Sequence, residues 1–298
     1  PNDLLFDVIQ HPYFQRLQRI KQLGLSAFVY PGAQHTRLQH SLGAMYLTNE
    51  ALKQLRQQGC NITQAEADGV LTAILLHDIG HGPFSHVLEE TLVHHVSHED
   101  ISLMLMQRMN DNMNGRLELA IRIFRDDYPK RFLHQLISSQ LDMDRMDYLQ
   151  RDCFFTGVAE GKIGSARIIK MLNVHNDKLV VEAKGIYSIE NFLIARRFMY
   201  WQVYLHKTSV AAEKMLVQIL RRAKELALRG ERLFASPALA YFLENRIDEN
   251  DFDDTALQHF VALDDTDVWS AIKVWSQHDD VVLGTLSRMF INRQLFKT

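Results

Sequence analysis

A histidine and an aspartate stand side by side at the end of an apolar run, at His77 and Asp78, and His81 and His86 follow closely. An isolated His-Asp pair is more often solvated or capping, but burying such groups is costly unless they are paired or bind a metal. Imidazole and carboxylate together suit Zn, Mn, Fe, Ni or Mg. Neighbours on a helix point about 100° apart, so this pair reaches one ion near a helix end without completing its coordination. The pattern predicts a metal site whose other ligands come from elsewhere in the chain.

A second group of candidate side chains lies on a helix that we expect over residues 131–152. Asp144, Tyr148 and Arg151 are spaced four and three residues apart, so a helix places them on one face. A carboxylate, a phenol and a guanidinium on one stripe suit a metal ion next to a bound phosphate. Taken alone, such a stripe is more often a set of surface ion pairs, and both interpretations stay open.

A third group begins at Arg37. Arg37 and His40 are three residues apart, so they share a face of the helix that we expect over residues 37–55. Gly43 and Ala44 follow one turn later and allow another helix to come close. This helix is therefore a candidate source of further ligands.

The elements that must position these residues are almost all helical. Start signals stand at Pro12, at Thr36, at Thr63 with Glu66, and at Ser97. The expected elements are two short helices over 4–24 with Gly24 past the end of the second, a short extended piece over 27–32, helices over 37–55, from 64 into the His-Asp pair and over 131–152, a β-hairpin over 175–189, and one or two long helices over 189–229. The fold class is therefore all-α with a small β-hairpin insertion. We expect a core over residues 1–230 and a smaller C-terminal helical subdomain over 231–298.

Composition excludes some classes of function. The chain has 298 residues and a net charge of −3, so it can bury a large core but carries no global basic field for nucleic acid. We see no apolar run long enough for a membrane helix. Cys60 and Cys153 form no disulfide framework and are typical of reduced thiols in a cytoplasmic protein. Because the first residue is Pro1 and not Met, we expect the N-terminus to be incomplete.

The order of these residues carries a resemblance. His40, His77-Asp78 and Asp144 fit the H…HD…D pattern of the HD-domain metal-dependent phosphohydrolases, a family of helical bundles. The longer segments 35–43, 77–86, 97–99 and 142–152 resemble the deoxynucleotide triphosphohydrolases, which include the core of the vertebrate SAM-and-HD-domain enzyme and bacterial relatives. The resemblance covers about residues 5–215.

The resemblance implies a dNTP triphosphohydrolase with one divalent metal ion. It implies that the metal ligands are His40, His77, Asp78 and Asp144. It implies that the reacting phosphate is lined by His81, His86, His98 and Arg37, and that phosphate and sugar contacts come from Gln22, Leu23, Arg37, Arg145, Tyr148, Asp152, Arg196 and Tyr204. Such a metal lowers the pKa of a bound water, and the guanidiniums donate where charge builds. Either His86 or His98 would protonate the leaving nucleoside oxygen, and the sequence does not separate them.

The resemblance also has implications for sugar binding and for the oligomeric state. Gln22 and Asp152 match positions that hold the 3′-hydroxyl, while Leu23 and Tyr204 match positions that crowd the 2′ carbon. The acidic and Arg positions that bind an activating nucleotide in the vertebrate enzyme align here with glutamines, namely Gln10 and Gln18, although Lys207 matches a basic residue of that region. The departure argues against a guanine-specific activator site. The family implies a homo-oligomer, a dimer or a tetramer, with no membrane partner.

Two other functions remain open at this stage. The same ligands would serve an HD-type nucleotidase or phosphodiesterase that acts on another nucleotide. A non-catalytic HD protein that binds nucleotides or nucleic acid is the third reading, although it would not need a full set of metal ligands. The histidines outside the motifs, which we expect at the surface or with ordinary partners, are His11, His94, His95, His134, His175, His259 and His278.

Overall fold

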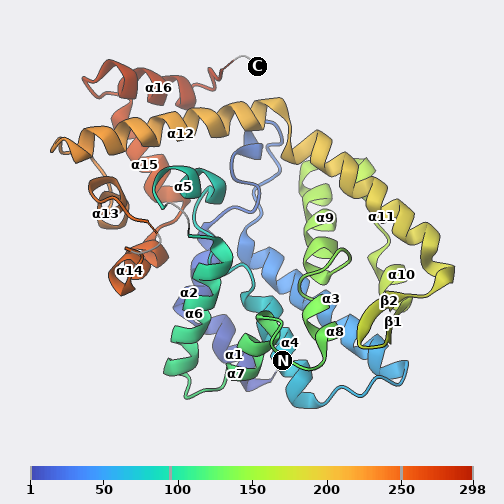
Figure 1. Ribbon diagram of the computed structural model, residues 1–298. Coiled ribbons are helices and arrows are strands. Elements are labelled where there is room, and N and C mark those ends of the chain that lie inside the picture. Colours follow the sequence, from blue (N-terminus) through green and yellow to red (C-terminus); the bar gives the residue numbers. More distant parts are fainter. Residues whose placement is uncertain (1, 94–95, 249–250, 297–298) are drawn as a thin grey trace.

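A computed structural model describes residues 2–93, 96–248 and 251–296 of the chain, so His94 and His95 lie outside the described residues. The protein is a helical bundle that carries one small sheet (Figure 1). The elements before the sheet are α1 (Asp3–Gln10), α2 (Pro12–Gln15), α3 (Arg37–Gln57), α4 (Gln64–Leu76), α5 (Ser85–Thr91), α6 (His98–Asn112), α7 (Glu118–Phe124), α8 (Arg131–Gln135), α9 (Met143–Thr156) and α10 (Ser165–Lys170). The sheet and the elements after it are β1 (Leu172–His175), β2 (Lys178–Val181), α11 (Ile186–Met199), α12 (Lys207–Leu228), α13 (Pro237–Glu244), α14 (Asp254–Ala262), α15 (Asp265–Trp275) and α16 (Val281–Ile291). The all-α fold class with a small hairpin is confirmed.

Helix α4 is the centre of the bundle. It begins with the expected capping box, in which Thr63 N donates to Glu66 Oε2 at 2.8 Å and Glu66 N donates to Thr63 Oγ1 at 3.2 Å. Every residue from Gly69 to Leu76 is buried, and α4 packs against α3 and α7. A helix that is apolar on all sides belongs inside a protein. The chain therefore delivers the residues after Leu76 directly into the interior.

Helices α3 and α9 lie against each other beside α4. Gly43 allows this approach, because a Cβ there would collide with the side chains of Asp147 and Arg151. The expectation that this stretch of α3 admits another helix is confirmed. The close contact brings the start of α3 next to the first turns of α9 (Figure 1).

The prediction of a continuous helix over residues 131–152 is wrong. The chain leaves the helical path between α8 and α9, because Asp142 caps the second helix. Its side chain accepts from Arg145 N at 2.7 Å and from Ser139 N at 2.8 Å. The break sets the direction of α9 independently of α8, with Asp144 in the first turn of α9.

Two other expectations need correction. The segment over 27–32 is not extended, because Gly24–Phe28 forms a 3₁₀ helix that is followed by a turn. The hairpin is shorter than expected, since it ends at Val181 and the chain becomes helical again from 183. Its turn at Asn176 and Asp177 is confirmed, with φ of 49° and 59°. The expected long helices over 189–229 are α11 and α12, joined by a π-helical turn at Tyr200–Tyr204.

The C-terminal helices pack back onto the start of the chain. The fully buried Arg16 donates to the carbonyls of Ile79 and His81 at 2.9 Å each and to Val261 O at 3.2 Å. This guanidinium therefore ties the loop after α4 to the end of α14. A subdomain boundary at 230 stays a prediction. None of the described helices is both long and apolar enough to cross a membrane.

Candidate functional site

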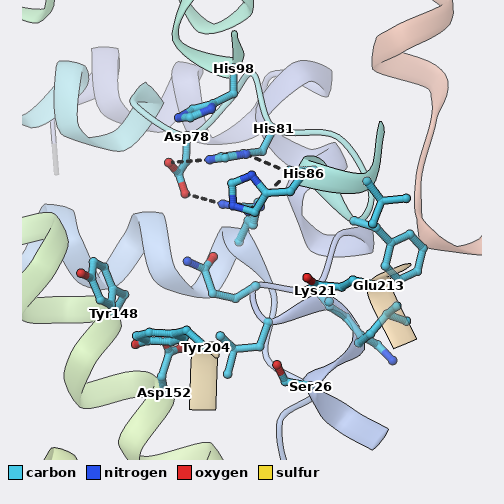
Figure 2. A pocket seen from close by; sticks show the side chains of 18 of the residues that line it. Lys21, Ser26, Asp78, His81, His86, His98, Tyr148, Asp152, Tyr204 and Glu213 are labelled. Atoms are coloured by element: carbon cyan, nitrogen blue, oxygen red, sulfur yellow. Dashed lines mark hydrogen bonds and ion pairs between the residues drawn. The ribbon is translucent and has the colours of Figure 1, made fainter. Parts of the chain in front are cut away.

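A cavity of about 770 Å³ opens beside the end of α4 (Figure 2). Its walls come from the segment 21–26, the start of α3, the turns around α5 and α6, the face of α9, and the chain from 200 to 213. Predicted residues that line it are Gln22, Leu23, Arg37, Asp78, His81, His86, His98, Asp144, Arg145, Tyr148, Asp152 and Tyr204. Segments far apart in the sequence therefore meet at one site, as the motif pattern predicted.

Four of the predicted side chains meet at the floor of the cavity. Asp78 and Asp144 line it, and His40 and His77 contact these carboxylates without lining it themselves. Asp144 Oδ1 lies 3.0 Å from His40 Nε2 and 3.3 Å from His77 Nε2. Asp78 lies 3.3 Å from His77 Nε2 through Oδ1 and 3.8 Å from His40 Nε2 through Oδ2. Ligand atoms of His40, His77 and Asp78 all lie within 4.8 Å of one another. Two imidazoles and two carboxylates therefore converge on one point.

The outer nitrogen of each imidazole is already engaged. His40 Nδ1 is 2.8 Å from Asp147 Oδ2, and His77 Nδ1 is 2.6 Å from Ile74 O. A carbonyl oxygen only accepts, so His77 Nδ1 carries a hydrogen and His77 Nε2 is the nitrogen left to bind an ion. Among the described residues, both Nε2 atoms are buried and have no hydrogen-bond partner, although carboxylate oxygens lie nearby. This donor set fits a divalent metal ion.

Electrostatics at the floor also favour a cation. Burial lowers the pKa of His40, but the adjacent Asp144 and Asp147 carboxylates raise it to about 10. Burial raises the pKa of Asp78, but His77 and Arg37 hold it well below its usual range. The carboxylates therefore remain ionised, and they attract whichever positive charge occupies the floor.

Arg37 reaches the floor from the first turn of α3. Its Nη1 donates to Asp78 Oδ2 at 2.7 Å, and its Nη2 lies 3.5 Å from Ser85 Oγ. Its Nε is buried and has no partner among the described residues. The guanidinium thus keeps donor capacity directly beside the carboxylate pair.

A second cluster combines His81, His98 and Glu89. The rings of His81 and His98 stack at a centroid distance of 4.0 Å and an angle of 14°. Ser85 Oγ donates to Gly82 O, so His81 Nδ1 must donate to Ser85 Oγ at 2.8 Å. Burial and the nearby Arg37 lower the pKa of His81 to about 3. His81 is therefore neutral, and its Nε2 lies 3.4 Å from Asp78 Oδ1.

The second cluster cannot hold an ion as the first can. Ligand atoms of His81, Glu89 and His98 lie as close together as those at the floor. An imidazole binds a metal along its lone pair, in the plane of the ring. Two nearly parallel rings that stack have planes that do not meet at a shared point. Among the described residues, ring geometry therefore favours the floor group over the stacked group as the candidate metal site.

Glu89 connects two of the predicted histidines. Its carboxylate lies 3.5 Å from His98 Nδ1 and 3.6 Å from His86 Nδ1. The His86 side chain is 83% exposed, so it stands at the rim of the cavity. The contact with Glu89 raises the pKa of His86. His86 therefore stands where solvent can reach its ring.

The far wall carries the predicted sugar contacts. Asp152 accepts from Tyr204 Oη at 2.8 Å and lies 2.7 Å from His35 Nε2. Gln22 Oε1 is buried without a partner among the described residues, and such an acceptor costs free energy until it is satisfied. An acceptor and a carboxylate on one wall suit a hydroxyl group.

Four predicted residues lie outside the set that lines the cavity, namely His40 and His77, which contact Asp78 and Asp144, and Arg196 and Arg151. Arg196 places its guanidinium 5.7 Å from the ring centroid of Tyr200, which does line it, so the phosphate contact of Arg196 stays a prediction. Arg151 does not line the cavity as Asp144 and Tyr148 do, because its guanidinium pairs with Asp147. The interpretation of that stripe as surface ion pairs is wrong for Asp144 and Tyr148, which face the cavity.

Sequence reasoning missed several residues that hold these side chains. Asp147 and His35 lie inside the motif segments but received no role. Glu89 received none either, although it stands three residues after His86, a spacing that brings helical side chains together. Ser85 could have been found in the same way, four residues after His81. These spacings were visible, but many other polar pairs share them.

Family comparisons cover most of the chain. A family model described as HD domain matches residues 37–152, and one described as HD associated region matches residues 163–246. The uncharacterized protein YwfO of Bacillus subtilis is 35% identical over 302 residues, which cover 99% of this chain and 67% of the relative. The crystal structure of a phosphohydrolase from Bacteroides thetaiotaomicron is 66% identical, with a TM-score of 0.98, over all of this chain and 74% of that one.

A more distant relative is named for its activity. Deoxynucleoside triphosphate triphosphohydrolase SAMHD1 of Gallus gallus is 28% identical over 264 residues, which cover 74% of this chain. The chain spans only 43% of the length of that protein. The similarity therefore concerns the region that carries the cavity, and not the whole of that enzyme.

Proposed function

The chain belongs to the HD-domain family, and we propose that it is a metal-dependent phosphohydrolase that cleaves dNTPs at the α-phosphate to deoxynucleoside and triphosphate. The observation that carries the proposal is the pair of orphaned Nε2 atoms of His40 and His77. They face two carboxylates on the floor of a cavity, and the cavity walls hold hydrogen-bond donors suited to phosphate. This combination suits a phosphate ester more than any other substrate class.

We assign the metal to four residues. His40, His77, Asp78 and Asp144 would hold one divalent ion, of which Mn, Fe, Zn, Ni and Mg are the candidates. When bound, such an ion lowers the pKa of a coordinated water and polarises a phosphoryl oxygen. The remaining chemistry belongs to the protein side chains around it.

Guanidinium and phenol groups would hold the phosphates. Arg37 is anchored on Asp78, which leaves its other nitrogens to donate to the α-phosphate. Arg145 is steadied by a 2.7 Å bond from its Nε to Ser139 O, so its terminal nitrogens are presented to the cavity. Burial raises the pKa of Tyr148, which keeps the phenol a donor at any working pH. Donors in place before the reaction stabilise the charge that develops in the transition state.

Proton supply would come from the rim. As the bond from water oxygen to the α-phosphorus forms, the bond to the nucleoside O5′ breaks and that oxygen needs a proton. His86 and His98 both touch Glu89, and this contact raises the pKa of His86, which favours its protonated form. We assign the general acid to this pair, supported by Glu89. The neutral His81 contributes an acceptor next to Asp78.

The sugar would bind against the far wall. Gln22 and Asp152 would hold the 3′-hydroxyl, whose single hydrogen can satisfy the orphaned Gln22 Oε1. Leu23 and Tyr204 would occupy the space beside the 2′ carbon. Because Tyr204 Oη already donates to Asp152, it has no hydrogen left to donate to a 2′-hydroxyl. This arrangement favours deoxyribose.

Product analysis tests the function. The protein is incubated with each of the four dNTPs and NTPs and with Mn²⁺ or Mg²⁺, and the products are separated by ion-exchange chromatography. We expect deoxynucleoside and triphosphate. Release of inorganic phosphate alone, or turnover of a monophosphate or cyclic nucleotide, would contradict triphosphohydrolysis and favour another HD hydrolase. Tight nucleic-acid binding without turnover would contradict catalysis altogether.

We also propose a homo-oligomer in a reducing compartment, the cytoplasm. Tyr187, Ile194 and Trp201 follow one another at seven-residue intervals along α11 and its π-helical end, and all three are exposed. Glu190 and Arg197 are exposed on the same helix, so two antiparallel copies of α11 would pair these opposite charges. Both cysteines are free, as expected in such a compartment. Light scattering of the wild type and of Trp201→Glu tests the assembly; a monomeric wild type would contradict it.

A further inference from the structure

His40 is supported differently from the other imidazole at the floor. Its ring is fully buried, and Nδ1 lies 2.8 Å from Asp147 Oδ2. His77 is held instead by the neutral carbonyl of Ile74. One imidazole therefore rests on an ionised carboxylate and the other on the main chain of its own helix.

The carboxylate behind His40 is itself held in two places. Arg151 Nε donates to Asp147 Oδ2 at 2.8 Å, and Arg151 Nη2 donates to Oδ1 at 2.9 Å. Bidentate pairs of this kind fix the plane of the carboxylate as well as its position. Asp147 can therefore present Oδ2 to the imidazole in one orientation only.

Neither Asp147 nor Arg151 lines the cavity. Nδ1 and Nε2 lie on different sides of the His40 ring, and Asp147 occupies the side away from Asp144. Both carboxylate oxygens of Asp147 are engaged, so it has no oxygen directed at the floor. Any effect of the pair on an ion or on substrate must pass through His40.

Gly43 makes room for this arrangement. A Cβ at this position would collide with Asp147 Oδ1 and with Arg151 Nη2. Because Gly43 lies three residues after His40 on α3, the helix that carries the imidazole also carries the space for its support. A larger residue would displace the pair without removing any charge.

We propose that Asp147 and Arg151 are positioning residues that orient His40 and hold its hydrogen on Nδ1, so that Nε2 faces the metal. The proposal rests on the proposed metal site. A carboxylate that accepts from a ligating imidazole fixes the tautomer and makes the ligand more basic, and loss of such a partner costs about 10- to 100-fold in metal affinity. Arg151 adds the charge that makes burial of Asp147 tolerable.

Metal affinity measured by competition with a chromogenic chelator tests the proposal. We expect Mn²⁺ affinity to fall about 100-fold in Asp147→Ala and about 10-fold in Asp147→Asn, which still accepts from Nδ1. Gly43→Ala and Arg151→Met should also weaken binding, and they serve if Asp147→Ala does not fold. At saturating Mn²⁺, the KM for substrate should be unchanged.

Glu66→Gln is the matched control. Glu66 is a buried carboxylate that pairs with Lys130 at 2.8 Å, far from the cavity lining. The Glu66→Gln substitution should lower thermal stability and leave metal affinity unchanged. This result would separate positioning of His40 from a general loss of structure.

Three results are distinguishable. Wild-type Mn²⁺ affinity in Asp147→Ala, with affinity lost in His40→Ala, would overturn the positioning role and leave the metal site intact. Wild-type affinity in both variants would overturn the metal site itself, and the positioning role with it. If the metal binds as expected but dNTPs are not hydrolysed, the substrate proposal fails and the affinity series still supports positioning.

Discussion

The two histidine clusters of the site have nearly the same composition but differ in the angle between their imidazole rings. The floor pair, His40 and His77, has rings at 74° with centroids 5.3 Å apart, whereas the stacked pair, His81 and His98, has rings at 14° and 4.0 Å. Both pairs have carboxylates within reach. Only in the floor pair can two in-plane lone pairs point at one place. Residue types and proximity thus do not define a metal site; the orientation of each ring does.

The clusters also differ in access to water. The His40 side chain is fully buried, whereas the side chains of His98 and Glu89 are 32% and 34% exposed. A buried imidazole can hold an ion for long times, and a solvated one can exchange protons between turnovers. The difference predicts a division of labour, with binding at the floor and proton transfer above it.

The largest expected effect comes from breaking the floor pair. His77→Ala should abolish stoichiometric metal binding and lower kcat/KM by roughly 1,000-fold, about 4 kcal/mol, because the activated water is lost. Elemental analysis and product assays check both. Full metal content together with full activity would remove the basis for assigning chemistry to the floor.

Breaking the stacked pair should leave the metal in place. His98→Ala should keep wild-type metal content while kcat falls by about 100-fold, the usual contribution of a positioned acid. The same elemental analysis, run beside single-turnover kinetics, separates the two clusters. Loss of metal in this variant would mean that the clusters are one site.

Metal removal should distinguish the clusters by stability. At a metal concentration about 100 times the Kd, binding stabilises the folded protein by about 2.7 kcal/mol. Chelation should therefore lower the Tm of wild type and of His98→Ala alike, and should leave the Tm of His77→Ala unchanged. Differential scanning calorimetry with and without chelator measures this; equal shifts in all three proteins would argue against the floor as the binding site.

The smallest effect should be a shift in pH dependence. His86 has a pKa raised by its contact with Glu89, so it stays protonated to higher pH, and activity that needs this proton falls only as pH rises through that raised pKa. Glu89→Gln removes the contact, lowers the pKa of His86, and should move the alkaline limb of the kcat/KM profile to lower pH. Glu90→Gln, on the neighbouring residue, is the control. An unmoved limb would take His86 and Glu89 out of proton transfer.

Much of the local structure could be predicted because its causes are local. The capping boxes at Thr63 and Ser97 set the starts of α4 and α6, since each side chain bonds a main-chain nitrogen three residues on. The long apolar run of α4 could only be a buried helix. The break before α9 was missed because Asp142 acts as a cap there, whereas its spacing fits a continuous helix equally well.

Within the site, the sequence predicted the candidate ligands. It did not predict the residues that hydrogen-bond to these side chains and orient them. The pairing of His98 with Glu89 could not be read from the motif, in which Glu99 is the adjacent carboxylate. Glu99 is exposed, and the contact comes from α5. Asp147 and Arg151 were similarly indistinguishable from surface ion pairs until α3 was seen to pack against them.

By itself, the sequence determined that His77 and Asp78 end a buried helix and that the chain is a helical bundle, because capping and hydrophobic burial act over a few residues. Only the tertiary structure decided which nitrogen of each imidazole faces the cavity. That choice depends on the partner of the other nitrogen, and for His40 the partner stands 107 residues away on another helix. Ring orientation is a property of packed neighbours, so no spacing along the chain could specify it.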